Sequence, residues 1–221
     1  MEGGKKFLVL FLIILFPSLL YVVLSKGKHN FMTLASYGPK EISENGDTLY
    51  HTIPAFNFTN QFGQQINSRE SDQKYIVANF FFTTCKTICI PMNLEMQKVY
   101  HAFKDREDIV FYSFTVDPET DSSEALLEYS KQFRDIEKGK WQFLTGKKED
   151  LYALAQKKFF LTAMQDSTIP DFIHDDRIVL LDKKRRIRGF YKATDGEEIK
   201  RLIDEIKVLK VEEQIPKKEA H

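Results

Sequence analysis

Hydrophobic positions along the chain form one long N-terminal block and a series of shorter segments separated by polar residues. The block, FLVLFLIILFPSLLYVVL at residues 7–24, contains no charged residue. A membrane-spanning helix needs about 20 apolar residues, with roughly 17 as the lower limit. Pro17 does not exclude a span, because helices in lipid tolerate proline. We therefore expect residues 1–24 to form an N-terminal membrane anchor, with a transmembrane helix at 7–24.

Other interpretations of this block fit the neighbouring residues less well. A cleaved signal peptide would have a shorter apolar region and a small-residue exit, whereas this block ends in Leu24-Ser25-Lys26. A lipoprotein would need a cysteine directly after it, and a buried core helix would not be apolar all round with lysines at both ends. Because lysines flank both ends, charge does not decide the orientation of the span.

The rest of the chain divides by its polarity into a linker, a domain and a tail. Residues 25–50 are polar and aperiodic, which predicts a linker, and residues 210–221 predict a polar C-terminal tail. Between them, residues 51–209 alternate between strand and helix patterns. Strands are expected over 54–58 as a short edge strand, and over 75–83, 109–116, 141–144, 178–182 and 187–191. Helices are expected over 91–103, 122–133, 148–160 and 197–209.

The order of these elements predicts the fold class. Strands that alternate with crossover helices favour an α/β fold with a partly parallel sheet. The last two strands are too close for a helix between them, so they form a hairpin around the charged residues 183–186. A βαβ unit followed by a ββα unit is the thioredoxin plan. We expect a thioredoxin-like fold, a central mixed sheet flanked by helices.

Composition narrows the function classes. Lys+Arg and Asp+Glu both number 32, so the formal net charge is zero and no global field favours nucleic acid. Hydrophobic residues make up 43% of the chain, enough to build a core without disulfide staples. With only two cysteines the chain has no disulfide framework, so the two cysteines are considered as a candidate functional site.

Cys85 and Cys89 are four residues apart, between the apolar strand at 75–83 and the helix expected from residue 91. On a helix such residues share a face, with Cβ atoms about 5–6 Å apart. Two thiolates there could bind one soft ion or close a disulfide. A helix N-terminus lowers the pKa of a thiol, which favours the reactive anion. The alternative is a pair of inert core cysteines or a plain structural disulfide.

Two sulfurs and one imidazole form a soft ligand set that suits copper. Structural zinc usually takes four protein ligands, and the chain has no third cysteine. The histidines are His29, His51, His101, His174 and His221. His174 stands out because it lies in a loop just before the strand at 178–182, and in a thioredoxin fold that loop faces the cysteine helix.

Four segments, in order, resemble motifs of the Sco/SenC family of copper chaperones for cytochrome c oxidase assembly. Residues 80–89 (FFFTTCKTIC) resemble the copper motif of the family, residues 115–121 (TVDPETD) its D-P-x-x-D loop, and residues 141–146 (WQFLTG) its W-x-x-L-T-G strand. His174, followed by the strand at 178–182, is similar to the single histidine ligand of the family.

The resemblance implies a copper ion held by Cys85, Cys89 and His174 and passed to the dinuclear copper site of an oxidase subunit. It also implies a short N-terminal membrane anchor and a domain on the extracytoplasmic, periplasmic side. Asp117 looks like a loop-structuring residue rather than a ligand.

The chain departs from the family pattern at three positions near the predicted ligands. Lys86 replaces the usual proline after the first cysteine, Ile90 intervenes before Pro91, and Ile173 replaces the usual aspartate before the histidine. Lys86 should favour thiolate but disfavour a bound cation.

Other functions are compatible with the same cysteines. A thiol–disulfide oxidoreductase would act through Cys85 and Cys89, with His174 dispensable. A peroxidase-like thiol enzyme would need an activating arginine, and none lies near Cys85 in sequence. A structural membrane-tethered module would leave the ordered motifs unexplained. The leading interpretation is a copper chaperone rather than an enzyme.

Overall fold

The computed structural model describes residues 33–161 and 176–214, together with some positions between 11 and 21. The chain divides into two compact units, Met1–Thr33 and Leu34–His221. The second unit contains the sheet and the cysteines.

The predicted membrane anchor, histidine ligand and C-terminal tail fall wholly or partly outside the described residues. In the described part of the chain, no helix is both long enough and apolar enough to cross a membrane. The expected anchor at 7–24 is described at some positions only, and His174 and residues 215–221 lie outside the described residues. The membrane anchor and the histidine ligand therefore stay predictions.

A seven-stranded mixed sheet forms the centre of the unit, in the order β4-β3-β7-β6-β5-β8-β9. Its strands are β3 (Asn57–Asn60), β4 (Gln65–Asn67), β5 (Tyr75–Phe81), β6 (Ile109–Thr115), β7 (Trp141–Thr145), β8 (Arg177–Leu181) and β9 (Ile187–Lys192). The neighbours β5–β6 and β6–β7 are parallel and the others antiparallel. β5 and β6 are buried throughout, as unbroken apolar runs predict for strands covered on both faces. The predicted central mixed sheet and the β8–β9 hairpin are confirmed.

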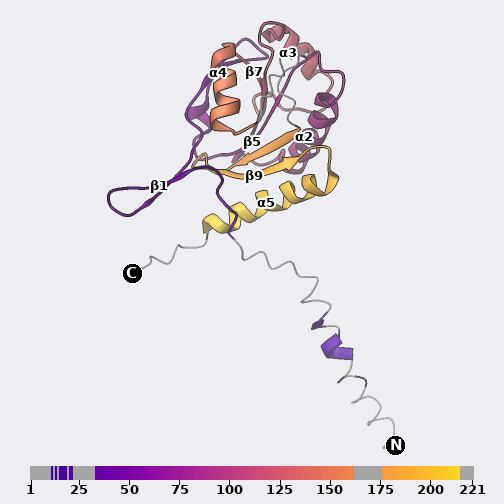
Figure 1. Ribbon diagram of the computed structural model, residues 1–221. Coiled ribbons are helices and arrows are strands. Elements are labelled where there is room, and N and C mark those ends of the chain that lie inside the picture. The colour runs from indigo at the N-terminus through magenta and orange to yellow at the C-terminus, as the bar shows by residue number, and fades with distance from the viewer. Residues whose placement is uncertain are drawn as a thin grey trace, which may run out of the picture. The chain divides into compact units, whose positions relative to one another are not determined.

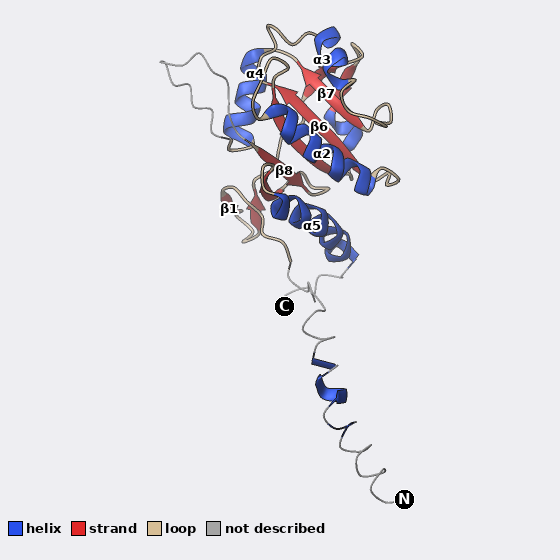
Figure 2. Cartoon of the chain, turned by 90° about the vertical axis from the view of Figure 1, so that its right-hand side faces the viewer, coloured by secondary structure: helices blue, strands red, loops and turns tan. Residues whose placement is uncertain are grey.

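Helices cover both faces of this sheet (Figures 1 and 2). They are α2 (Cys89–Phe103), α3 (Ser123–Ser130), α4 (Lys148–Ala153), the π-helical η2 (Leu154–Lys158) that continues it, α5 (Gly196–Gln214) and the short 3-10 helix η1 (Ser68–Ser71). α3 begins where expected, because the Ser122 side chain accepts a hydrogen bond from the backbone N–H of Ala125 at 3.3 Å.

Alternate residues of β5 identify which helix covers which face. Asn79 hydrogen-bonds to Asn93 of α2, and the ring of Phe81 lies 4.9 Å from the ring of Tyr129 on α3. Phe80 points to the other face, where its ring lies 5.3 Å from that of Phe159, the residue after η2. α2 and α3 thus cover one face, and the segment α4–η2 covers the other.

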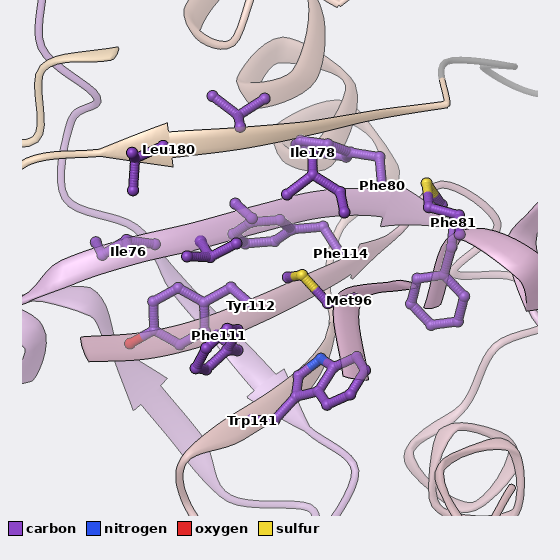
Figure 3. Packing of buried hydrophobic residues seen from close by; sticks show 14 of the residues in the cluster. Ile76, Phe80, Phe81, Met96, Phe111, Tyr112, Phe114, Trp141, Ile178 and Leu180 are labelled. Atoms are coloured by element: carbon purple, nitrogen blue, oxygen red, sulfur yellow. The ribbon is translucent and has the colours of Figure 1, made fainter. Parts of the chain in front are cut away.

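The large side chains of the core follow the strands across the sheet (Figure 3). Leu180 of β8, Ile76 of β5, Phe114 of β6 and Trp141 of β7 mark four successive strands in that view, and all four are buried. Met96 of α2 belongs to the same buried cluster. Phenylalanines supply much of this core.

The expected edge strand at 54–58 is displaced and is not at an edge. β3 begins at Asn57 and lies between β7 and β4, and β4 forms the edge of the sheet. Gly63, with φ of 72°, lets the chain reverse. The Asn60 side chain closes the turn by accepting hydrogen bonds from the N–H groups of Phe62 and Gln64, both at 2.9 Å. After the reversal the chain forms β4, which was not predicted because three mostly polar residues show no strand pattern.

The segment expected as a linker contains a hairpin of β1 (Lys40–Ile42) and β2 (Thr48–Tyr50), which projects from the domain (Figure 1). All six of its strand residues are exposed, so no alternation of apolar and polar positions marks it. At the other end, α5 continues past residue 209 to Gln214. Glu212 in that extra turn pairs with the buried Arg188 at 2.7 Å, which extends the helix.

Candidate functional site

The two cysteines lie where the chain leaves β5 and enters α2. Cys89 is the first residue of α2, whereas Cys85 lies in the turn before it. The expectation that they share a helical face is therefore wrong. The chain forms a turn at Thr83 instead of a helix, and the backbone N–H of Thr83 donates a hydrogen bond to the Asp121 carboxylate at 3.1 Å.

The turn still brings the two cysteines into contact. The backbone N–H of Cys89 donates a hydrogen bond to the sulfur of Cys85 at 3.4 Å. Both are free thiols, and their exposed fractions are only 4% for Cys85 and 3% for Cys89. A pair of neighbouring thiols in a dry environment can bind one soft metal ion or form a disulfide.

The sulfur of Cys85 is set up to carry negative charge. Burial raises the pKa of its thiol, but hydrogen bonds from the Cys89 thiol and from the backbone N–H groups of Thr87 and Cys89 outweigh burial and lower the pKa below its ordinary value. The Thr87 hydroxyl, 3.7 Å from the sulfur, adds to this effect. These hydrogen-bond donors lower the pKa of the thiol, which is the effect predicted for a helix N-terminus. Lys86 is exposed beside them.

Cys89 is set up in the opposite way. Burial raises the pKa of its thiol strongly, and the hydrogen bond to Cys85 and the charges of Cys85 and Asp121 raise it further. Between the two pKa values the pair therefore consists of a Cys85 thiolate and a Cys89 thiol. This asymmetry makes Cys85 the more reactive sulfur of the pair, since the thiolate is the reactive form.

Asp121 holds the loop that precedes Cys85, a role that was not expected from the sequence. Its carboxylate, fully buried, accepts hydrogen bonds from the Thr83 N–H, the Thr83 hydroxyl and the Thr115 hydroxyl, the last at 2.5 Å. Burial raises the pKa of this carboxyl, although these hydrogen bonds oppose the rise. The signal that could have found it is the second aspartate of the D-P-x-x-D loop. Asp117 shapes that loop through its backbone, as expected, because its carbonyl accepts from the Asp121 N–H at 2.8 Å.

A chain of buried polar side chains runs beneath α2. The Trp141 indole N–H donates to the Ser113 hydroxyl at 2.9 Å, and Ser113 donates to Asn79 at 2.6 Å. Asn79 donates to Asn93 at 2.7 Å, and Asn93 donates to the Tyr129 hydroxyl at 2.9 Å. We call these five residues the polar chain. It joins three neighbouring strands of the sheet to α3 and to α2, whose first residue is Cys89.

The predicted third ligand, His174, lies outside the described residues, so its approach to the cysteines stays a prediction. Over residues 33–161 and 176–214, no group of three or more histidine, cysteine or acidic side chains could hold a metal ion. His51 has another role: its Nε2 contacts the carbonyl of Lys158 at 2.8 Å and its ring packs on Phe160. His101 lies on α2, exposed, with its ring against Tyr100.

The chain is similar to known proteins over most of its length. It is 26% identical over 179 residues to the SCO1 protein homolog of Bacillus subtilis, which covers 80% of this chain and 91% of that protein. The crystal structure of a SCO1/SenC family lipoprotein from Bacillus anthracis superposes with a TM-score of 0.65 at 28% identity, over 72% of this chain and 95% of the other.

Two further structures add to this comparison. BsSco, whose structure identified a disulfide switch and which is a member of the Sco family of cytochrome c oxidase assembly proteins, has a TM-score of 0.63 at 25% identity, over 72% of this chain and 93% of the other. Copper-bound ScoI from Arabidopsis thaliana shares the fold, with a TM-score of 0.57 at 21% identity, over 70% of this chain and 98% of the other. Residues 45–210 match the SCO1/SenC family, and the chain therefore belongs to that family.

Proposed function

We propose that this chain is a copper-binding assembly factor that delivers copper to the dinuclear copper site of cytochrome c oxidase. Its ligands are Cys85, Cys89 and His174. The observation that carries the proposal is the contact between the two thiols at the start of α2, with Cys85 surrounded by hydrogen-bond donors. Family membership supports it, since BsSco is named as an oxidase assembly protein and other Sco structures hold copper.

The chemistry of the pair suits the binding and release of a soft ion. Thiolates favour soft metals, Cu(I) among them, and imidazole also suits copper; a metal binds cysteine only in its deprotonated form. Cys85 offers a thiolate first, and Cys89 completes the pair when its proton leaves. His174 supplies the imidazole. Burial of both sulfurs excludes water from the cargo until a partner docks.

We further propose that residues 7–24 anchor the chain in the membrane and that the domain lies on the extracytoplasmic side. The uncharged apolar run supports the anchor, and the Bacillus anthracis relative is itself a lipoprotein. The anchor predicts that the full chain stays in the membrane fraction after an alkaline carbonate wash. Deletion of residues 7–24 should release it, and retention of the deleted chain would contradict the anchor.

The test of function is a copper titration of the reduced full chain in detergent, for wild type, His174→Ala and His101→Ala. Sulfur-to-copper charge-transfer absorption gives both stoichiometry and coordination. We expect one copper per chain in wild type, a weakened or altered complex in His174→Ala, and a wild-type complex in His101→Ala, the matched surface control. Absence of specific copper binding in wild type would refute the proposal.

A thiol–disulfide oxidoreductase is the second candidate, and the asymmetry of the two thiols favours it. A thiolate beside a high-pKa thiol is the arrangement that attacks a disulfide and then resolves the mixed disulfide. This function predicts that His174→Ala leaves disulfide exchange with a model substrate unchanged. If His174→Ala abolishes oxidase assembly while exchange persists, copper delivery is the function and exchange is secondary.

A further inference from the structure

The exposed face of α2 changes in character along the helix. Its first two turns expose Ile90, Pro91 and Leu94, whereas a later turn exposes the charged Lys98. Ile90 keeps 38% of its surface exposed and Leu94 keeps 43%, although the other large apolar side chains of the helix are buried. The large apolar side chains that α2 exposes are therefore confined to the end that begins with Cys89.

These three exposed residues adjoin one another. Side chains three and four residues apart on a helix are neighbours, so Leu94 lies beside both Ile90 and Pro91. The fold itself makes little use of them, because Met92 and Met96 already bury the opposite face of the helix. A single exposed apolar residue is ordinary. Three adjoining ones beside a functional site form a small apolar surface of the kind that a partner protein covers.

Lys86 places a positive charge next to this apolar surface. It is exposed in the turn that leads into α2. Lys98 is paired with Glu95 at 2.6 Å, whereas Lys86 makes no ion pair with any residue that the structure describes. The formal net charge of the chain is zero, so Lys86 is a local charge and not part of a general positive field. An unpaired lysine here fits a partner that presents a carboxylate.

The two cysteines border the same surface. Lys86 follows Cys85 directly in the chain, and Ile90 follows Cys89, and both cysteines are buried. A metal ion passes between two proteins only when ligands of the receiving protein reach it. The receiving protein must therefore contact the surface that immediately surrounds the sulfurs. We call Lys86, Ile90, Pro91 and Leu94, which form part of that surface, the docking patch.

We propose that the docking patch is where the copper-accepting oxidase subunit docks, with an apolar contact on Ile90 and Leu94 and a carboxylate of the partner facing Lys86. This inference rests on the proposed function and adds the contact surface and its chemistry. The apolar contact supplies affinity and excludes water from the exchange. Lys86 speeds the encounter and fixes the orientation. Because Lys86 and Ile90 are positions where the chain departs from the family pattern, the patch is suited to the partner of this chain.

The test measures binding of the full chain, in detergent with reduced thiols and without metal, to the soluble copper-site domain of the oxidase subunit from the same organism. Surface plasmon resonance gives the association and dissociation rates. Ile90→Gln and Leu94→Gln remove the apolar contact, and Lys86→Glu reverses the charge. Val211→Gln is the apolar control, 53% exposed on α5, and Lys184→Glu is the charge control. All five positions are exposed, so each variant should keep the wild-type free energy of unfolding.

We expect Ile90→Gln and Leu94→Gln each to weaken the affinity roughly tenfold, mainly through faster dissociation. Lys86→Glu should slow association several-fold at low salt, and the difference should vanish at about 1 M salt, where charges are screened beyond about 3 Å. Both controls should bind as wild type does.

Three outcomes would overturn the inference. The first is wild-type affinity in both Ile90→Gln and Leu94→Gln, or an equal loss in Val211→Gln. The second is faster association in Lys86→Glu, which would show that the partner presents a positive surface. The third is self-association of the chain that Leu94→Gln abolishes, without binding to the oxidase domain, which would assign the patch to a second copy of the chain.

The same variants separate this inference from the proposed function, because docking is measured without copper. Docking that Ile90→Gln and Leu94→Gln weaken, in a chain that binds no copper, would refute copper delivery and leave the docking patch in place. Normal copper loading with docking that no patch variant changes would refute the docking patch alone. If both proposals hold, Leu94→Gln should still load one copper per chain and transfer it to the oxidase domain roughly tenfold more slowly.

Discussion

The backbone N–H of Cys89 points at the sulfur of Cys85 and lies 3.4 Å from it. Through this contact the first residue of α2 acts on the residue that precedes the helix. The contact helps to lower the pKa of Cys85, whereas burial, and then the hydrogen bond between the two thiols, raises the pKa of Cys89, so the two thiols are unequal.

The unequal thiols predict selective alkylation. In the reduced protein, Cys85 should react with iodoacetamide with a pH midpoint below that of an ordinary thiol, about 8.5, and Cys89 should stay unreactive to well above it. The rate at Cys85 should fall as pH drops through its pKa. Mass spectrometry of the labelled peptides identifies the site. Faster labelling of Cys89 would contradict the assignment.

The thiol of Cys89 contributes to that low pKa by donating to Cys85. Cys89→Ser keeps an O–H donor, and Cys89→Ala removes it. The alkylation midpoint of Cys85 should therefore rise more in Cys89→Ala than in Cys89→Ser. Equal midpoints in the two variants would show that the backbone N–H groups alone set the pKa.

Copper binding should release a countable number of protons. At a pH between the two thiol pKa values, Cys85 is already a thiolate and Cys89 still carries its proton. Binding should then release one proton per copper from the pair, and affinity should rise with pH. Titration in a weakly buffered solution with a pH indicator measures the release. Two protons per copper at the alkylation midpoint or above would contradict the asymmetry.

Asp121 should stabilise the loop before Cys85. Asp121→Ala leaves two hydroxyls and one N–H without their acceptor, and each buried unsatisfied group costs about 1–3 kcal/mol. We expect the free energy of unfolding to fall by about 2 kcal/mol or more, measured by urea denaturation. Glu119→Ala is the control, because Glu119 is exposed and makes only a surface pair with Lys148. It should change stability by less than about 1 kcal/mol.

The raised pKa of Asp121 predicts a specific pH dependence. In the window between the ordinary aspartate pKa and the raised one, the folded protein binds more protons than the unfolded chain. The contribution of Asp121 to stability therefore falls as pH rises through that window. Asp121→Asn cannot ionise, so its stability relative to wild type should improve over the same window. A relative stability that worsens with rising pH would reverse the sign of the shift.

Substitution of the buried Arg188 should strongly lower the free energy of unfolding. Its guanidinium is 3% exposed and pairs with Asp182 at 3.1 Å and Glu212 at 2.7 Å. Arg188→Met leaves two acidic groups without this partner and should destabilise the protein by about 3–5 kcal/mol. Lys200→Met, at an exposed pair with Glu197, should cost about 0–1 kcal/mol. Urea denaturation of both variants gives the comparison.

Much of the fold was predictable because buried strands carry unbroken apolar runs. β5 and β6 are identifiable from sequence alone. Both of their faces are covered, and all of their residues except Asn79, Ser113 and Thr115 are apolar. β1, β2 and β4 were not predicted, because exposed or edge strands of three residues have no periodicity to detect. Their formation depends on turns and on tertiary contacts such as the pairing of Tyr37 with Ile187.

The cysteine pair was predictable as a contact but not in its detailed geometry. The spacing of Cys85 and Cys89 suggested one helical face, whereas a turn held by Asp121 places Cys85 before the helix. That carboxylate lies more than thirty residues from the cysteines in sequence. The D-P-x-x-D loop draws attention to Asp121, but only the parallel pairing of β5 with β6 brings it to the turn before Cys85.

The ends of the described domain meet, and this has a practical consequence for protein engineering. The N–H of Leu34 donates to the carboxylate of Glu212 at 3.1 Å, and Arg188 bonds to the carbonyls of Leu34 and Ala35. A short linker from Gln214 to Leu34 would close the domain into a ring, which could be reopened at the exposed β1–β2 turn, between Asn45 and Gly46. Such a circular permutant should fold with its sheet intact, and its new ends would lie at the tip of the projecting hairpin.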